Sequence, residues 1–520
     1  MGTSRRQFLR MAAAAGGAAW AARMAAAQAP AAQPPATLDP AQLRQWVAEL
    51  PRPPVARAAA GALDITLGAT EWRLHPQLPP TRMWTYNGSF PGPTIEARSG
   101  EALTIRWHNR LPARHFLPVD TSLAGAAPGL PAVRAVAHVH GARVPAASDG
   151  YPEHWSVAGE TQEFHYPNRQ AAATLYYHDH AMGLGRLNIY AGLSGMYLIR
   201  DESEAALGLP ADEAEMPLLL CDRWLDARGQ LFYPVSGIAG HPWVPEVEGN
   251  CLLVNGALWP RWRVEARAYR LRLCNGANTR ILRLGMSGGL RLHVIGTGQG
   301  LLPHAVEVSE LTLAPGERAD VVVDFRPVAG EKVYFSDAGR AMMRVEVAAA
   351  TSRAASWQPA RLAAPLPALP TPLRTRRLTL NEYDDQHGAM AMMLLDGKRW
   401  DDAVSEAPRL GDSEVWELVN LTGDTHPIHL HEVRFRILDR RPFDAEQYLL
   451  DKTMRYTAEA RPPSAEEDGW KDTARCYAGE VTRIGIHFEG YPGRYVWHCH
   501  LLEHADNAMM RPYEIRAAKA

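Results

Sequence analysis

The sequence predicts an all-β protein made of three copies of one Greek-key β-barrel domain. A run of alternating residues that ends in asparagine occurs three times, at 102–109, 268–275 and 413–420, as expected of half-buried strands. A Gly-Glu turn follows each run, at 158–160, 315–317 and 478–480. The length of 520 residues suits about three domains of roughly 150 residues. The 40 prolines and 42 glycines suit short strands joined by many turns.

Composition divides the chain further. An N-terminal signal is expected at 1–27 and a linker containing several prolines at 28–45. A second stretch rich in proline and alanine, at 351–372, is typical of a tether between domains. The three domains are therefore predicted at 46–203, 204–350 and 373–520.

The first residues predict export. Arg5 and Arg6 precede an Ala-rich, weakly apolar stretch that runs to Ala27 and is interrupted by Arg23. This pattern is typical of a twin-arginine signal and not of a permanent transmembrane helix. The twin-arginine export machinery is therefore an expected partner, no stable membrane span is expected in the mature form, and a periplasmic or secreted location is predicted.

A His-Cys-His triplet at 498–500 predicts copper. Successive side chains of a strand face opposite ways, so the two histidines face one side and Cys499 the other. Cys499, His504 and Met509 supply thiolate, imidazole and thioether, which with one further imidazole form a blue-copper site. His426, which belongs to no His-x-His pair, is the expected fourth ligand.

Three more His-x-His pairs predict a second metal centre. They are His138 with His140, His178 with His180, and His429 with His431, which with His498 and His500 make eight paired histidines. Each pair presents both rings to one face of a strand, and one metal ion cannot use eight imidazoles. Similar segments carry a pair in the first and third repeats, whereas 333–337 of the middle repeat has none. A cluster of several metal ions is therefore expected between the first and third domains.

Histidine and cysteine also occur outside copper sites, and those roles fit this pattern less well. A single histidine is more often a core or surface group than a ligand, and we interpret His75, His154, His165 and His487 in this way because they lack ligand spacing. Structural zinc prefers closed four-coordinate sets of cysteine and histidine. Ten histidines with one cysteine and one methionine fit copper better.

With these motifs the chain resembles the multicopper oxidases, in particular the branch of bacterial laccases, spore-coat laccases and bilirubin oxidases. The resemblance rests on the four ligand motifs in order and on flanking segments such as 148–153 and 439–443. It implies three cupredoxin-like domains and four coppers per chain. It further implies type 1 copper at His426, Cys499, His504 and Met509, type 2 copper at His138 and His429, and a type 3 pair at His140, His178, His180, His431, His498 and His500.

The implied reaction couples two half-reactions. Phenolic or aromatic-amine donors give one electron at a time at the type 1 site, and dioxygen takes four electrons at the cluster to form water. His426 is expected to present its outer edge to the donor. Beyond the ligands Cys499 and His426, we consider Asp149 a candidate proton source and Asp424 a candidate contact for the donor. Asp424 can equally be a turn residue that bonds its own backbone. Asp179 and Asp506 are further carboxylates near the ligand strands. Ala505 stands where this branch often has glutamate, which argues against a proton relay at that position.

Two other functions and several properties stay open at this point. A cuprous-ion or other metal-ion oxidase shares every ligand, although the Met-rich insertion of such enzymes is reduced here to Met390, Met392 and Met393, with Met342 and Met343 as an isolated pair. A non-enzymatic copper-binding protein, electron shuttle or scaffold needs fewer ligands than the chain carries.

A net charge of −2 argues against nucleic-acid binding. The sequence leaves open the natural donor, the redox potential, the oligomeric state and any pairing of Cys221, Cys251, Cys274 and Cys476.

Overall fold

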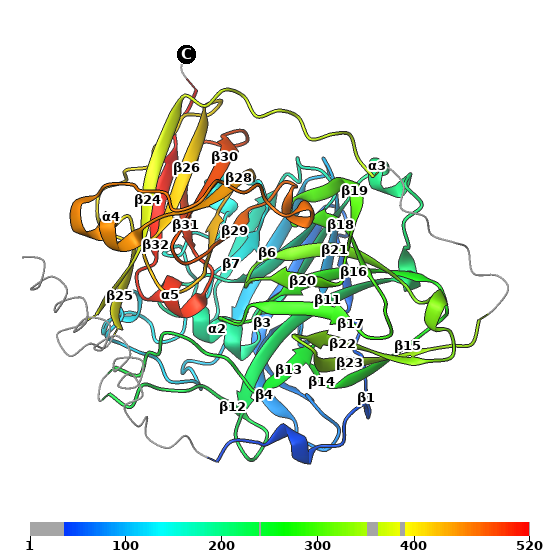
Figure 1. Ribbon diagram of the computed structural model, residues 1–520. Coiled ribbons are helices and arrows are strands. Elements are labelled where there is room, and N and C mark those ends of the chain that lie inside the picture. The colour runs from blue at the N-terminus through cyan, green and yellow to red at the C-terminus, as the bar shows by residue number, and fades with distance from the viewer. Residues whose placement is uncertain (1–35, 239–240, 351–361, 385–389, 519–520) are drawn as a thin grey trace, which may run out of the picture.

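The computed structural model describes residues 36–238, 241–350, 362–384 and 390–518 (Figure 1). Strands dominate it, and the all-β prediction is confirmed. The α-helices are short: α2 (Gly185–Ala191), α3 (Glu202–Ala205), α4 (Ala445–Asp451) and α5 (Leu502–Asp506). Single 3-10 turns occur at Pro40–Gln42, Ala124–Ala126, Ala146–Ser148, Asp212–Ala214, Arg326–Val328 and Ala465–Glu467.

The first domain is a sandwich of two open sheets. One sheet has the order β4-β3-β6-β8 and the other β2-β5-β10-β9-β7. The strands are β2 (Val55–Arg57), β3 (Ala62–Trp72), β4 (Thr81–Tyr86), β5 (Thr94–Arg98), β6 (Leu103–Arg110), β7 (Ala137–His140), β8 (Thr161–Tyr166), β9 (Ala173–Asp179) and β10 (Ser194–Arg200). The strands β7 and β9 are buried along their whole length, so their histidines point into the protein.

The second domain has two larger sheets, in the orders β14-β13-β11-β16-β21-β18-β19, with β12 beside β11, and β1-β15-β23-β22-β17-β20. Its strands are β1 (Ala48–Glu49), β11 (Glu215–Leu225), β12 (Leu231–Phe232), β13 (Cys251–Val254), β14 (Ala257–Leu258), β15 (Pro260–Val264), β16 (Ala268–Asn275), β17 (Leu282–Met286), β18 (Leu292–Thr297), β19 (Gly300–Val308), β20 (Glu310–Leu313), β21 (Arg318–Asp324), β22 (Lys332–Asp337) and β23 (Arg340–Val347). The β1 strand, which the sequence assigned to the first domain, pairs with β15 of the second.

The third domain again stacks two sheets, β25-β24-β26-β30-β28 and β29-β27-β31-β32. Its strands are β24 (Arg374–Asp384), β25 (Met390–Leu395), β26 (Ser413–Asn420), β27 (His426–Leu430), β28 (Phe435–Pro442), β29 (Thr473–Cys476), β30 (Glu480–His487), β31 (Gly493–Cys499) and β32 (Met510–Ile515). In Figure 1 these yellow-to-red strands lie at the upper left, against the cyan β7 of the first domain.

The threefold repeat has a structural basis. The strands β6, β16 and β26 reach the repeated asparagines Asn109, Asn275 and Asn420. The side-chain carbonyl of each asparagine accepts a hydrogen bond from the backbone N–H two residues later, which turns the chain out of the strand. The glycines of the repeated Gly-Glu turns all adopt positive φ, between 67° and 94°, a conformation that glycine reaches without steric cost.

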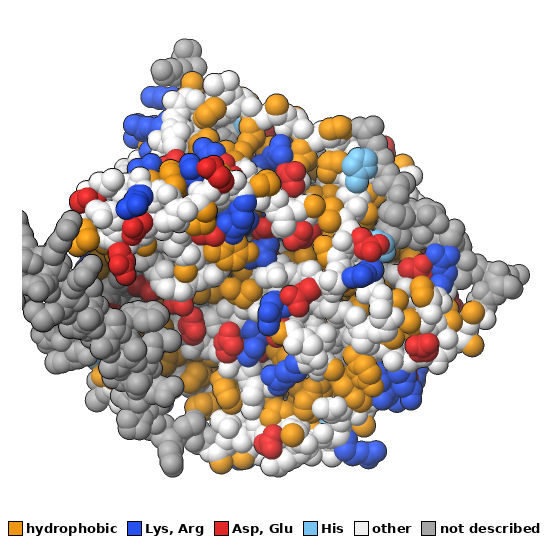
Figure 2. All heavy atoms as spheres, in the orientation of Figure 1, with side chains coloured by type: hydrophobic (Ala, Val, Ile, Leu, Met, Phe, Trp, Pro, Cys, Tyr) orange, Lys and Arg blue, Asp and Glu red, His pale blue; other side chains and the backbone are white. Residues whose placement is uncertain are grey.

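The structure shows the state of the cysteines, the place of the Met342–Met343 pair and the length of the helices. All five cysteines are buried and free, so none of the open pairings is formed. Met342 and Met343 lie in the core of the second domain. No helix among the described residues is long and apolar enough to cross a lipid bilayer, and the predicted export signal at 1–27 lies outside those residues. On the face shown in Figure 2, basic and acidic side chains are interspersed.

Candidate metal centre

One candidate metal set joins the end of β31 to the start of β27. The Sγ atom of Cys499 lies 3.5 Å from Nδ1 of His426 and 4.0 Å from Nδ1 of His504 in α5. The two Nδ1 atoms are 3.3 Å apart. Met509 is buried beside them and is held by backbone hydrogen bonds to His504 and Cys499. The structure therefore brings together the four residues that the sequence grouped.

Cys499 needs a cation before it can act as a thiolate. Its side chain is fully buried, and burial raises the pKa of the thiol well above its usual value, although the N–H of Leu501 donates to Sγ and lowers it. A coordinated metal ion deprotonates a thiol outright. The surroundings therefore favour a bound metal ion over a free thiolate.

The eight paired histidines come from two strand pairs, one in each outer domain. In the first domain β7 pairs with β9, which puts His138 opposite His178. In the third domain β27 pairs with β31, which puts His429 opposite His498. Side chains that face each other across neighbouring strands lie close together. His180, His431 and His500 follow directly after their strands, so the eight rings converge.

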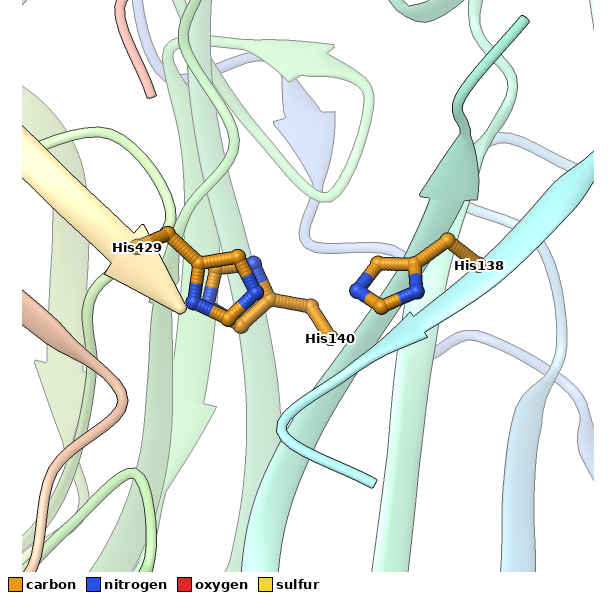
Figure 3. Close-up of side chains that lie close together, drawn as sticks. All are labelled: His138, His140 and His429. Carbon is orange, nitrogen blue, oxygen red and sulfur yellow. The ribbon is translucent and has the colours of Figure 1, made fainter. Parts of the chain in front are cut away.

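The rings of the two domains interleave. His138 stacks on His431 with centroids 3.7 Å apart, and His140 stacks on His429 at 3.6 Å. Figure 3 shows the rings of His140 and His429 lying over one another, with His138 to one side. Three groups of histidine nitrogens each lie within 4.8 Å: His138 with His140 and His429, His140 with His178 and His500, and His180 with His431 and His498. Asp149 forms a fourth group with His138 and His431. The structure thus gathers the eight residues predicted to form the cluster.

The distribution of protons shows that these groups fit metal ions. Nδ1 of His498 lies 2.8 Å from the Cys499 carbonyl, and Nδ1 of His431 lies 2.8 Å from Oδ2 of Asp149. The Cys499 carbonyl can only accept, so the single proton of His498 lies on Nδ1, and an ionised Asp149 places the proton of His431 there as well. The two Nε2 atoms, 3.3 Å apart, then face each other with lone pairs only, an arrangement that a metal ion relieves.

Three further Nε2 atoms support the same conclusion. His138, His178 and His429 each donate from Nδ1 to a backbone carbonyl. Their Nε2 atoms are buried and lack a hydrogen-bond partner among the described residues. Buried polar atoms are normally satisfied, so these nitrogens are suited to metal coordination.

Burial keeps the rings neutral. It lowers the pKa of His178 to about 3 and that of His498 to about 4, and it lowers the pKa of the other six rings well below the usual value. Neutral imidazole is the form of histidine that binds metal. The cluster is therefore ready for metal throughout the physiological pH range.

Two buried carboxylates orient the rings. Asp149, predicted as a proton source, accepts a hydrogen bond from Nδ1 of His431, and its own backbone carbonyl accepts one from His138 at 2.6 Å. Asp472, which the sequence did not single out, lies 3.0 Å from Nε2 of His140. A lone aspartate has no spacing pattern, so only the folded structure places it here.

A small cavity reaches the cluster beside α2 and α5. His178, His180 and His498 line it together with Ala505 and Asp506. Asp179 and Asp506 are the carboxylates among its lining residues. Asp506 is bound by Arg186 at 3.1 Å, and Asp179 accepts hydrogen bonds from Val136, Ala181 and Asn188. The two aspartates thus have structural partners.

The outer edge of His426 is covered, although the sequence predicted that it faces the donor. The residue is fully buried, and its Nε2 lies 2.7 Å from Oγ1 of Thr422 and 3.4 Å from Oε1 of Glu382. Asp424 is half-buried nearby. Burial raises its pKa, and the charge of Glu382 adds to this shift. In the turn before His426, the side chains of Asn420 and Thr422 both donate to the backbone carbonyl of Asp424. These bonds form the turn without the carboxylate of Asp424.

Comparison with known proteins places these observations in a family. One sequence profile named Multicopper oxidase matches residues 69–121 and 133–204, and another of that name matches 369–519. A laccase of Bacillus subtilis is 42% identical over 87% of this chain and 94% of its own length, and a laccase of Bacillus stratosphericus is 42% identical over 91% and 99%.

A solved structure agrees with these matches. The crystal structure of a laccase from Pediococcus acidilactici superposes with a TM-score of 0.75 at 26% identity, over 91% of this chain and 95% of that one. The predicted cupredoxin-like fold is thereby confirmed. The chain belongs to the multicopper oxidase family, and copper is its cofactor.

Proposed function

We propose that this protein is a laccase-like oxidase, which takes single electrons from phenolic or aromatic-amine donors and reduces dioxygen to water. The observation that carries the proposal is the His-Cys-His triplet at 498–500. Cys499 faces the mononuclear set, while its two neighbours in sequence face the cluster. One short stretch of chain therefore connects the two centres. The two Bacillus relatives that are named laccases support an oxidase of this type.

The proposed ligands follow the observed groups. His426, Cys499, His504 and Met509 would hold type 1 copper, and His138 and His429 would hold type 2 copper. One type 3 copper would lie among His140, His178 and His500, and the other among His180, His431 and His498. When bound, copper supplies one-electron transfer at the first site and four-electron reduction of dioxygen at the cluster.

Residues of the chain have separate roles in electron entry, electron transfer and ligand orientation. His426 would receive the electron under the cover of Thr422 and Glu382, and the Cys499 segment would pass it to the cluster. Asp149 would hold His431 in the tautomer that leaves Nε2 free. We also propose that the export signal takes the mature protein to the periplasm or the medium, as the sequence of residues 1–27 indicates.

Variants of Asp149 distinguish two roles for this residue, which are to orient the ring of His431 and to supply protons to the cluster. We expect Asp149→Ala to lower turnover about 10- to 100-fold, the usual effect of removing a partner of a metal ligand, together with a loss of cluster copper. Asp149→Asn retains an acceptor for His431 and should keep its copper. If Asp149 also supplies protons, the asparagine variant will turn over as slowly as the alanine variant despite full copper. If both variants retain wild-type turnover, neither role is correct.

Asp424 is our candidate for binding the donor. A phenol at this surface would donate its O–H to the carboxylate. An exposed ion pair is worth about 0.2–1 kcal/mol, so Asp424→Asn should raise KM for a cationic amine about two- to fivefold. It should also raise KM for a neutral phenol, because a hydrogen bond to a charged acceptor is stronger than one to a neutral acceptor. It should lower KM for a sulfonated donor. Asp468→Asn, which breaks an exposed ion pair with Arg436, is the charge-matched control. Unchanged KM values for all three donors would remove the idea.

Metal-ion oxidation is the second candidate. The observation in its favour is a set of carboxylates near His426. Oε1 of Glu382 lies 3.4 Å from Nε2 of His426, and Asp424 stands two residues before His426. Burial, together with the charges of Asp424, Glu248 and Glu382, raises the pKa of Glu246 to about 7. Negative charge gathered in this way attracts cations. Cuprous or ferrous ion and dimethoxyphenol should be compared under one set of conditions. A larger kcat/KM for the metal ion would put this candidate first.

A further inference from the structure

The middle domain contributes no proposed ligand, yet it lies against the cluster. Gly316 is in the turn before β21, and a Cβ atom at this position would lie 2.7 Å from Cδ2 of His500 and 2.9 Å from Cε1 of His140. The next residue but one is Arg318, which is 2% exposed. Thr161 and Val481 occupy the same place in the outer repeats. The middle repeat thus has an arginine beside the metal centre.

Arg318 binds residues of all three domains. Its Nη1 and Nη2 atoms donate to Oδ1 and Oδ2 of Asp472 in the third domain, at 2.7 and 2.5 Å. Its Nε donates to the carbonyl of Thr174 in the first domain, and further bonds reach Gly316 and Gly298 in its own. A two-pronged contact of this kind fixes the plane of the carboxylate as well as its position.

Gln299, which also belongs to the middle domain, donates a further hydrogen bond to Asp472. Its Nε2 lies 2.6 Å from Oδ2 of Asp472 and 2.9 Å from the carbonyl of Gly141. A Cβ at Gly141 would lie 2.6–2.7 Å from atoms of Asp472, Gln299 and Arg318, so the glycine leaves the room that this network needs.

Asp472 in turn contacts two rings of the cluster. Its Oδ1 lies 3.0 Å from Nε2 of His140, and its backbone carbonyl lies 2.8 Å from Nδ1 of His429. Thr473 donates its hydroxyl hydrogen to Asp472 and therefore offers an oxygen lone pair to the same Nε2 of His140, at 2.9 Å. Both contacts place the proton of His140 on Nε2.

His140 differs from the other seven cluster histidines, all of which the structure describes. Each of those seven has Nε2 facing the cluster or unpartnered beside it. His140 alone turns Nδ1 inward, 3.2 Å from Nε2 of His500. Backbone carbonyls fix the tautomer of four of the others, whereas the tautomer of His140 depends on a carboxylate that the middle domain holds.

We propose that Arg318 and Gln299 are positioning residues of the middle domain, which hold Asp472 so that His140 offers Nδ1 to the cluster. This inference rests on the proposed function only in assigning His140 to the copper cluster. The middle domain is then part of the dioxygen site and not only a spacer between the outer domains.

The amide pair Gln299 and Gln170 provides a matched test. Both side chains are buried and donate to the carbonyl of Gly141, at 2.9 and 3.0 Å, but only Gln299 also reaches Asp472. We expect Gln299→Leu to change the electron paramagnetic resonance spectrum of the copper cluster, of which His140 is a proposed ligand, and to lower cluster copper or turnover about 10- to 100-fold. The blue absorbance should be unchanged. Gln170→Leu should match the wild type in all four measurements.

Two further variants test whether the effect passes through Asp472. Arg318→Lys keeps the charge but loses the two-pronged contact, and it should change the same spectrum more than Gln299→Leu does. In an Asp472→Ala background, which removes the acceptor of Gln299, Gln299→Leu should add nothing further. The inference is wrong if Gln299→Leu and Arg318→Lys both retain wild-type spectra and copper content, or if Gln170→Leu is as harmful as Gln299→Leu. A wild type that is fully loaded but inactive with every donor would refute the proposed function, while these spectra would still decide the inference.

Discussion

Replacing Cys499 by serine is expected to abolish both the blue colour and oxygen uptake of the copper-loaded protein. Cys499 is the thiolate of the proposed mononuclear site, and its segment is the link to His498 and His500. Serine retains the shape of the side chain but not the sulfur ligand. The loss of turnover should exceed the roughly 10- to 100-fold effect of changing a residue that only supports a ligand. Visible absorbance and an oxygen electrode measure both effects.

Cys476→Ser is the control for this experiment. Cys476 is also fully buried and stands opposite His426 in the adjoining strand β29, but it is not a proposed ligand. This variant should keep its blue absorbance and most of its oxygen uptake. Oxygen uptake that survives in Cys499→Ser would show that electrons enter the cluster by another route.

The second large effect is expected from removing one ring of the cluster. His431→Ala should retain blue absorbance, because His431 is not part of the mononuclear set. A donor should still bleach the blue band in the absence of oxygen, but the colour should not return in air. Steady oxygen uptake should fall by more than about 100-fold. Stopped-flow absorbance separates reduction by the donor from reoxidation by dioxygen.

His165→Ala is the control for His431→Ala. The side chain of His165 is 66% exposed, and His165 belongs to no His-x-His pair. That variant should be reduced and reoxidised like the wild type. If His431→Ala regains its blue colour in air at the wild-type rate, His431 does not take part in dioxygen reduction.

Local sequence patterns predicted the parts of the protein that repeat. Alternation with a closing asparagine located β6, β16 and β26 within one residue at each end, because the asparagine itself turns the chain. The His-x-His pairs predicted the cluster because a strand sends both rings of a pair to one side. Pairing of β7 with β9 and of β27 with β31 then brings the pairs together.

Contacts between distant segments left no local pattern. Asp472 and Arg318 are 154 positions apart, and either residue alone resembles any charged residue. Glu382 covers His426 from the end of β24, which only the packing of the two sheets of the third domain decides. The short strand β1 joins the second domain although it precedes the first in sequence. Each of these depends on tertiary packing and not on spacing.

The most direct test of the proposed function is the stoichiometry of oxygen consumption. The copper-loaded mature protein should be given dimethoxyphenol while oxidised donor, dioxygen and hydrogen peroxide are measured together. The function proposed here predicts four one-electron equivalents of donor for each dioxygen consumed, with no accumulation of peroxide. Two equivalents for each dioxygen with peroxide as the product, or no uptake by fully loaded protein, would contradict it.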